Sequence, residues 1–340
     1  MRVIRLKAPG EWDKFTTEEL SRDLLPGEAL IQIKKMGVCG TDLHAFKGNQ
    51  PFFEYPRILG HELAVEVLAI GEMVSNVQVG DRCSVEPYYN EKIGQAVRRG
   101  KTNCGEHLRV LGVHVDGGMQ EQMILPAQFL HPSNKLSDDQ LALIEPLAIG
   151  CHAVDRARIH HDDKVLVIGA GPIGLGAIQF AQLTGAKVIA MDLEADKLKK
   201  AREITQIKDT VLVSDHIEED LMEILEGDLP TIVLDATGNS KSMLNTFKYV
   251  AAGGTIVFIG LFQGDVVFND PYFHKKELTL MASRAALSTD FSRIIRLIEA
   301  GKINPERYIT HRIKYDEVPE EFVKLYDFGG DLIKAIIDYD

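Results

Sequence analysis

The chain has 340 residues, more than one hydrophobic core usually supports, so two domains are expected. Hydrophobic residues make up 45% of it, charged residues 26%, and the formal net charge is −12. Without any basic block, this composition argues against a nucleic acid or an anionic membrane as partner. No apolar run reaches the roughly 20 residues of a membrane span, and the N-terminus lacks a signal-peptide core, so we expect a cytoplasmic protein.

Residues 1–150 have the pattern of an all-β region. The stretches ALIQIKKMGVCG, HELAVEVLAIG and VGDRCSVEP each predict a short strand next to a glycine turn. Four cysteines are scattered along the chain, which favours free thiols over a disulfide framework. Of these, Cys83 and Cys151 are expected in the core.

From about residue 150 the pattern changes to alternating strands and helices. KVLVIG predicts a strand covered on both faces, and a helix follows from about Ile173 to Leu183. TIVLDATG, GGTIVFIG and ELTLMAS predict further strands of a parallel, doubly wound sheet. After about 287 come an amphipathic helix and a mixed tail. We therefore predict an α/β protein in which residues 151–286 form a nucleotide-binding domain, and residues 1–150 with 287–340 form a β-rich domain.

A dinucleotide fingerprint follows the KVLVIG strand. Its G-x-G-x-x-G pattern opens the predicted helix, and an acidic residue, Asp192, closes the next strand. The first glycine permits a tight turn, the second lets a pyrophosphate approach the backbone, and the third allows close helix–strand packing. The residues of this loop are Gly169, Gly171, Pro172, Ile173 and Gly174.

Asp192 also indicates which dinucleotide is bound. Its carboxylate can accept hydrogen bonds from both adenosine ribose hydroxyls and would repel a 2′-phosphate, and no arginine follows it, so NAD is favoured over NADP. Lys197 can reach the ribose edge or serve as an exposed helix lysine. Thr237, Gly260 and Leu261 follow later strands at the edge where ligands bind, and are candidate neighbours of the nicotinamide or ordinary turn residues.

The β-rich half contains a possible metal-ligand set. Cys39 in GVCGTDLH, His61 and Glu62 in GHELAVEV, and Glu145 in EPLAIGCHAV offer thiolate, imidazole and carboxylate donors, which suit zinc. A metalloprotease helix is excluded because the second histidine of that motif is replaced by Val65.

Five motifs occur along the chain in this order: GVCGTDLH, GHE, VGDRC, EPLA and VIGAGPIGLGAIQFA. In their order and spacing the chain resembles the zinc-containing medium-chain alcohol and polyol dehydrogenases, over essentially its whole length. The resemblance implies a chaperonin-10-like (GroES-like) catalytic domain around a Rossmann domain. It also implies a catalytic zinc held by Cys39, His61 and Glu62, with Glu145 either a fourth ligand or the residue that holds the zinc's water.

The same resemblance implies a reaction. Zinc lowers the pKa of a substrate hydroxyl, and a hydride passes to the nicotinamide of NAD. Thr41 then passes the alcohol proton on, and the imidazole of His44 carries it to solvent. The alternative for His44 is a surface histidine. Asp42 is expected to orient the loop.

Most members of the family carry a second, structural zinc in a four-cysteine lobe. Aligned by its flanks, this chain has Glu91, Gly94, Val97 and Gly105 at the four ligand positions, and only Cys104 lies nearby. One thiol cannot build a closed tetrahedral site, so we expect one catalytic zinc and no structural zinc.

The sequence predicts the substrate less specifically than it predicts the metal ligands and the cofactor. GVHVDGGMQEQ and ASRAALSTDF resemble the polyol and sugar-acid branch, in which Arg284 faces the substrate; a salt bridge at an interface is the alternative. His114 and Arg109 are weaker candidates. We favour a polyol or an aldonate such as L-galactonate or L-gulonate, with L-threonine or a sorbitol-type polyol as alternatives. A zincless reductase or a nucleotide-binding regulator is disfavoured by the intact cysteine and GHE. A quinone-type reductase that uses NADPH is a third alternative, in which Asp192 would not determine the choice of cofactor. The family usually forms dimers or tetramers, so a homodimer or homotetramer is expected.

Overall fold

A computed structural model describes residues 1–51 and 53–339. The chain forms two compact units, one made of Met1–Glu145 with Leu287–Asp340 and the other of Pro146–Ala286. The first division falls within helix α4 (Ile144–Ala157), a few residues before the limit expected at residue 150. No helix in the described part of the chain is long and apolar enough to cross a membrane.

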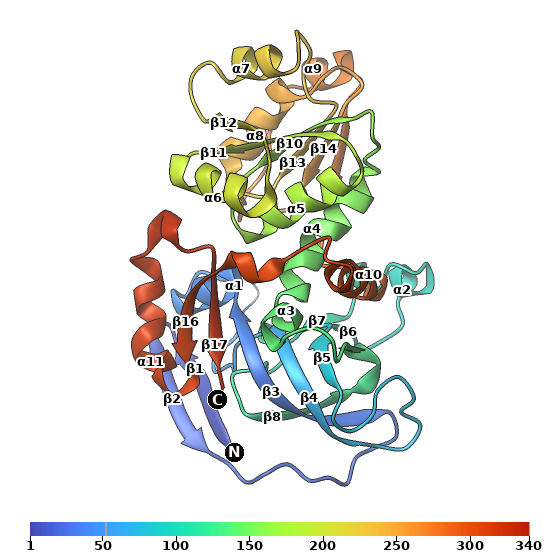
Figure 1. Ribbon diagram of the computed structural model, residues 1–340, viewed down its shortest axis with the longest axis vertical. Helices are drawn as coiled ribbons and strands as arrows, with labels where there is room; N and C mark the ends of the chain where they lie inside the picture. Colours follow the sequence, from blue (N-terminus) through green and yellow to red (C-terminus); the bar gives the residue numbers. More distant parts are fainter. Residues whose placement is uncertain (52, 340) are drawn as a thin grey trace. The chain divides into compact units, whose positions relative to one another are not determined.

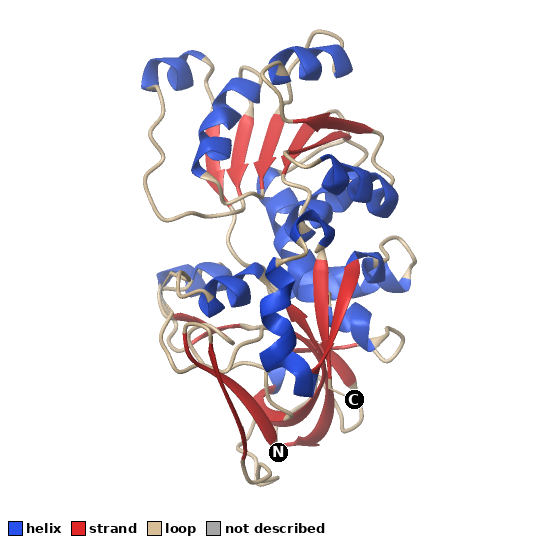
Figure 2. Cartoon of the chain, turned by 90° about the vertical axis from the view of Figure 1, so that its left-hand side faces the viewer, coloured by secondary structure: helices blue, strands red, loops and turns tan. Residues whose placement is uncertain are grey.

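The first unit is built on one large sheet (Figures 1 and 2). Its strands lie in the order β16-β17-β3-β4-β5-β9, and β8 also pairs with β3. All of these pairings are antiparallel except the parallel pair β16–β17. The strands are β3 (Glu28–Val38), β4 (Glu62–Ile70), β5 (Arg82–Val85), β8 (Gln122–Pro126), β9 (Leu130–Pro132), β16 (Ile309–Lys314) and β17 (Lys334–Asp338).

Smaller elements surround this sheet. Two short antiparallel pairs are β1 (Arg2–Ala8) with β2 (Glu11–Thr16), and β6 (Tyr88–Asn90) with β7 (Leu108–Val110). The helices are α1 (Gly40–Phe46), α2 (Gln95–Arg98), α3 (Asp138–Ala142), α10 (Ser288–Glu299) and α11 (Val318–Glu321). The apolar core joins both ends of the chain, because Ile4, Ile33, Leu63, Tyr315 and Ile337 are all buried in one cluster.

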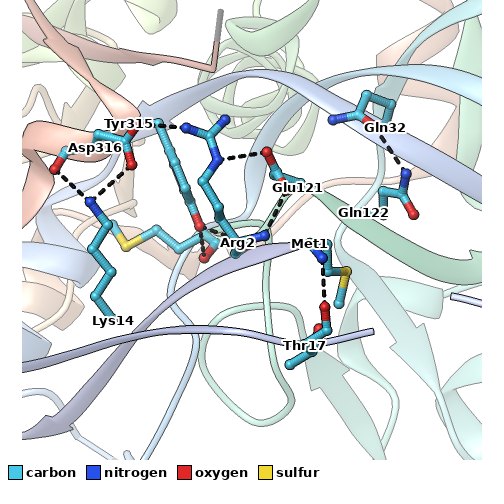
Figure 3. A network of polar contacts seen from close by, with 10 residues as sticks. Met1, Arg2, Lys14, Thr17, Gln32, Glu121, Gln122, Tyr315 and Asp316 are labelled. Carbon is cyan, nitrogen blue, oxygen red and sulfur yellow. Dashed lines mark hydrogen bonds and ion pairs between the residues drawn. The ribbon is translucent and has the colours of Figure 1, made fainter. Parts of the chain in front are cut away.

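A polar network ties the C-terminal segment to the N-terminal strands. Figure 3 shows Arg2 between two carboxylates: its Nε lies 2.7 Å from Glu121 Oε1, and its Nη1 lies 2.5 Å from Asp316 Oδ2. Lys14 Nζ lies 2.9 Å from the other oxygen of Asp316, and Tyr315 Oη donates to the carbonyl of Arg2. Residues about 300 positions apart thus share one cluster, which explains why the tail packs with the first unit.

The second unit is a parallel sheet with helices on both faces (Figure 1). Its strand order is β12-β11-β10-β13-β14-β15, the doubly wound order. The strands are β10 (Lys164–Ile168), β11 (Lys187–Asp192), β12 (Asp209–Leu212), β13 (Ile232–Asp235), β14 (Thr255–Phe258) and β15 (Thr279–Ala282). The helices are α5 (Pro172–Leu183), α6 (Ala195–Thr205), α7 (Ile217–Ile224), α8 (Ser240–Tyr249) and α9 (Asp270–Lys275).

Burial explains the sequence pattern of this unit. The central strand β10 has Val165, Leu166 and Val167 fully buried, as its continuous apolar run predicts for a strand covered on both faces. The predicted α/β class, with a β-rich unit and a Rossmann unit, is confirmed.

Candidate functional site

Strand pairing brings the predicted metal ligands together. In the antiparallel pair β3–β4, Gly37 lies opposite Glu62, so Cys39, just past the end of β3, comes close to His61 at the start of β4. One ligand atom from each of Cys39, His61 and Glu62 lies within 4.8 Å of the other two. A side chain at Gly37 would overlap the Glu62 carboxylate, so the absence of a Cβ there makes room for the site.

Asp42 lies beside both Cys39 and His61. Its Oδ2 accepts a hydrogen bond from the Cys39 amide at 2.9 Å, and its Oδ1 lies 4.0 Å from His61 Nδ1. These last two atoms are buried and have no hydrogen-bond partner among the described residues. With Nδ1 turned toward a carboxylate, as is usual for metal-binding histidines, Nε2 is the nitrogen left for a metal. The donor set and the unpaired polar atoms therefore fit a zinc ion.

A lysine that the sequence analysis did not identify completes this cluster. Lys334 opens β17, next to β3 in the sheet, and its Nζ donates to both oxygens of Glu62 at 2.7 Å and to the Val38 carbonyl at 3.1 Å. Both side chains of the ion pair are almost fully buried. Burial alone would lower the pKa of Lys334, but the Glu62 carboxylate raises it above its ordinary value, so the ammonium stays charged. The available signal was a single lysine in the apolar run LIKAII.

Glu145 lies in the first turn of α4 and meets a second residue missed from the sequence. Tyr88, buried on β6, donates its hydroxyl to Glu145 Oε1. Burial, with a further contribution from Glu62, raises the pKa of Glu145 to about 7, although His61 and Tyr88 oppose the shift. The structure thus brings Glu145 into electrostatic contact with the cluster, and its direct binding to a metal stays a prediction.

The electrostatics of His61 also reflect the cluster. Burial alone would lower the pKa of His61, but the Cys39 sulfur and the carboxylates of Asp42 and Glu145 raise it well above its ordinary value. Buried anionic groups that stabilise a positive charge on His61 would equally stabilise a divalent cation in its place.

Thr41 and His44 occupy one face of α1, three positions apart. Thr41 is half-buried near the start of the helix, whereas His44 is exposed and its Nδ1 lies 3.2 Å from Asn49 Oδ1. This arrangement offers hydroxyl and imidazole groups between the buried cluster and solvent.

The second unit builds the expected dinucleotide loop. Gly169 has φ +95°, and a Cβ at Gly174 would overlap the Gly169 carbonyl, so these two glycines are required by the turn itself. Gly171 caps α5 at its N-terminus, followed by Pro172 and Ile173. A Cβ at Gly171 would meet nothing within 4 Å, so the protein's own packing leaves that space open.

A cavity of about 580 Å³ adjoins this loop and is lined by Asp192, Lys197 and Thr237, among others. Asp192 accepts hydrogen bonds from the amides of Ala170 and Glu194 at 2.7 and 2.9 Å, and Lys197 Nζ lies 2.6 Å from Glu194 Oε1. Thr237 shares the cavity with Asp192, and its expected place beside the nicotinamide stays a prediction.

Gly260 and Leu261, the other two expected cofactor neighbours, follow β14. Neither is among the described residues that line the cavity. Gly260 packs against Gly238, and Leu261 is 73% exposed. A cofactor role for these two residues stays a prediction.

The candidate substrate residues lie on different units. Arg284 is exposed just after β15, in the second unit. His114 is half-buried in the first unit, where its Nδ1 accepts a hydrogen bond from the Val110 amide, and Arg109 pairs with Glu91 at 2.9 Å. These contacts give His114 and Arg109 structural tasks, and contact with a substrate stays a prediction.

The lobe between β6 and β7 is packed without cysteines at the family's ligand positions. Side chains at Gly94 and Gly105 would overlap Glu106 and Asn90, respectively. Glu106 Oε1 accepts from the Ala96 amide at 3.3 Å, and Asn90 Nδ2 donates to the Thr102 carbonyl at 2.9 Å. Of the four cysteines, Cys104 is exposed, while Cys83 and Cys151 are buried as expected.

Comparisons with known proteins agree with this geometry. The profile described as "Alcohol dehydrogenase GroES-like domain" matches residues 25–135, and the one described as "Zinc-binding dehydrogenase" matches residues 172–300. The chain is 41% identical over 317 residues to L-galactonate-5-dehydrogenase of Escherichia coli (strain K12), covering 93% of each chain. It is 31% identical to a D-xylulose reductase of Scheffersomyces stipitis, covering 96% of this chain and 95% of that one.

A solved structure is similar along the whole chain. It is an Escherichia coli CFT073 protein described as a short chain alcohol dehydrogenase, complexed with NADH. The TM-score is 0.92 at 27% sequence identity, covering 100% of this chain and 99% of that chain.

Proposed function

Because the chain belongs to the zinc-type medium-chain alcohol and polyol dehydrogenases, we propose that it oxidises a secondary alcohol of a sugar acid and passes the hydride to NAD⁺. The observation that carries this proposal is the buried cluster of Cys39, His61 and Glu62. The likeness to L-galactonate-5-dehydrogenase supports an aldonate such as L-galactonate or L-gulonate. The likeness to a D-xylulose reductase makes a polyol the second candidate.

Cys39, His61 and Glu62 would hold the zinc ion, and Glu145 would be either a fourth ligand or the residue that holds its water. When bound, zinc supplies a Lewis acid that lowers the pKa of the substrate hydroxyl. The chain's own residues prepare this site. Asp42 faces His61 Nδ1, and Lys334 fixes the Glu62 carboxylate through both of its oxygens. Burial of the cluster keeps water from screening these charges.

Thr41 and His44 provide a path for the alcohol proton. Thr41 is close in sequence to Cys39, and its hydroxyl can both accept and donate a proton. His44 is exposed on the same helical face and can release the proton to solvent. Asn49, at 3.2 Å from Nδ1, would orient the His44 ring.

The cofactor is proposed to be NAD rather than NADP. Asp192 is 8% exposed and presents its carboxylate to the cavity that adjoins the glycine loop. A 2′-phosphate there would bring two anionic groups together without an arginine to neutralise them. Lys197 is paired with Glu194, which reduces its ability to attract a 2′-phosphate.

Arg284 is proposed to bind the carboxylate of the sugar acid, because a guanidinium pairs with a carboxylate through two parallel hydrogen bonds. His114 is a weaker candidate for the same role. We further propose that the enzyme carries one catalytic zinc and no structural zinc, acts in the cytoplasm, and forms a homodimer or homotetramer.

The proposal can be tested by metal analysis together with a screen of NAD⁺ reduction over aldonates, polyols and L-threonine. About one zinc per chain and fastest turnover of an aldonate are expected. Arg284→Ala should raise KM for the aldonate by roughly 10-fold or more while leaving KM for a polyol nearly unchanged, because only the aldonate carries a carboxylate. Near-zero zinc in an active enzyme, or activity on simple alcohols alone, would refute the proposal. Two zinc ions per chain would refute the statement about the lobe.

A further inference from the structure

Asp235, at the end of β13, is a buried carboxylate that the reaction scheme above does not use. It is fully buried, and its contacts are to neutral donors. Oδ1 accepts from the Thr237 amide at 2.9 Å and from the Thr237 hydroxyl at 2.6 Å, and Oδ2 accepts from the Ser242 hydroxyl at 2.5 Å. Burial raises the pKa of this carboxyl group, so the position costs free energy that some other gain must offset.

The three donors come from the segments that form one wall of the dinucleotide cavity. Thr237 begins the turn after β13, and Ser242 lies in the first turn of α8. Both residues line the cavity that contains Asp192. Thr237 Oγ1 in turn accepts from the Asn239 amide at 3.1 Å, and Asn239 caps the N-terminus of α8. One carboxylate therefore determines the shape of the turn and the position of the helix that follows.

The backbone of Asp235 also contacts the segment that follows the next strand, β14. Its carbonyl accepts from the amides of Ile259 and Gly260 at 2.8 and 3.2 Å. There the two loops touch, because a Cβ at Gly260 would lie 2.7 Å from the Gly238 Cα. A displacement of the turn after β13 would therefore disturb the loop after β14 as well.

From these contacts we infer that Asp235 is a positioning residue, which holds Thr237 and the start of α8 in place as the adenosine-side wall of the cavity. The inference rests on the proposed dinucleotide binding. It predicts that Asp235 acts through shape and not through its charge, and that it affects the adenosine half of the cofactor.

A threonine just before β13 offers a matched control. At the other end of β13, the Thr231 hydroxyl donates to Asp163 Oδ1 at 2.8 Å and accepts from the Lys164 amide at 3.0 Å. Thr231→Val and Thr237→Val thus each remove a threonine hydroxyl that bonds to an aspartate, but only Thr237 lies at the cavity. A purely structural role would make the two variants behave alike.

The test measures binding of NADH and of ADP-ribose, a probe without nicotinamide, together with thermal stability. Asp235→Ala and Thr237→Val should weaken both ligands to the same extent, by roughly 10-fold or more for Asp235→Ala, because small displacements in a binding site have large effects. Asp235→Asn should stay within about 3-fold of wild type, because its amide oxygen can still accept from Thr237 and Ser242 Oγ can accept from its NH₂. Thr231→Val should bind both ligands normally.

If Asp235→Ala does not fold, Thr237→Val still decides the question. Normal ADP-ribose binding by Thr237→Val, equal binding losses in Thr231→Val, or a loss in Asp235→Asn as large as in Asp235→Ala would each overturn the inference. Failure of the wild-type protein to bind either ligand would instead refute the proposed cofactor itself, so the two failures are distinguishable.

Discussion

In the glycine loop, glycines that the fold requires can be distinguished from a glycine that only cofactor binding requires. The substitution Gly171→Ala tests this distinction. Gly171 has φ −76° and ψ −177°, a backbone conformation that alanine adopts without strain. Since a Cβ there would meet nothing within 4 Å, the folded protein has room for the new methyl group. The same methyl group would project into the space reserved for the pyrophosphate, which approaches the backbone at this glycine.

The two effects have different expected sizes. On stability, alanine is a poorer N-cap than glycine but also restricts the unfolded chain; each effect is about 1 kcal/mol or less and they oppose one another. On binding, forcing one extra methyl group into a close contact typically costs about 1–3 kcal/mol, which corresponds to about 5- to 140-fold in Kd. Gly171→Ala should therefore leave Tm nearly unchanged and weaken NADH and ADP-ribose by that factor.

Two other glycines of α5 supply the controls. A Cβ at Gly174 would overlap the Gly169 carbonyl oxygen and lie 2.8 Å from its carbon, so Gly174→Ala should destabilise the fold. A Cβ at Gly176 would lie 3.6 Å from Leu147, an ordinary contact, so Gly176→Ala should change neither property. Thermal unfolding and NADH fluorescence titration check these expectations. Normal NADH affinity in Gly171→Ala, or a drop in Tm as large as that of Gly174→Ala, would refute the reasoning.

Two further predictions concern the first unit. Burial alone would raise the pKa of Glu121, but hydrogen bonds from the backbone and side chain of Arg2 lower it below its ordinary value. The carboxylate therefore stabilises the fold above its unfolded pKa of about 4.3, and this contribution is lost as the pH falls through the folded pKa. The difference in free energy of unfolding between wild type and Glu121→Gln should stay under about 1 kcal/mol because Arg2 is partly exposed. This difference, followed through Tm across the pH range, should be constant above about pH 5.5 and shrink below about pH 4; an advantage of wild type that grows toward acid pH contradicts this. Lys334→Met leaves Glu62 buried without its cation and should cost about 3–5 kcal/mol in urea unfolding. Lys35→Met removes the partly exposed Lys35–Asp338 pair between β3 and β17 and should cost less; equal losses would show that burial of the Lys334 pair is unimportant.

Local patterns in the sequence were sufficient for the fold, whereas the metal cluster also needed the family resemblance. The run KVLVIG, the glycine spacing and the acidic residue Asp192 each depend on neighbours along the chain, and the structure places them where that spacing requires. Cys39 and His61 were paired through a family resemblance, and their proximity depends on the β3–β4 register, in which Gly37 faces Glu62.

Residues that act through distant partners were not predicted. Lys334 and Glu62 are separated by 272 positions, and Tyr88 and Glu145 by 57, so no periodicity or spacing links them. Thr237 was expected near the nicotinamide because it ends a strand, and that pattern does not say which part of a long cofactor lies there. In the structure Thr237 shares a cavity with Asp192, and the comparison of NADH with ADP-ribose tests which part of the cofactor it meets.

The position of β17 in its sheet has a consequence for how the protein is made. This strand holds Lys334 and Ile337, follows the whole second unit in the sequence, and yet lies between β16 and β3 inside the sheet of the first unit. A ribosome therefore makes the whole second unit before it makes this strand. Until β17 is made, Glu62 lacks the ammonium group of Lys334 and the edge of β3 that β17 covers is open. The cluster of Cys39, His61 and Glu62 is therefore completed late in synthesis, and removal of β17 would harm it more than the distance in sequence suggests.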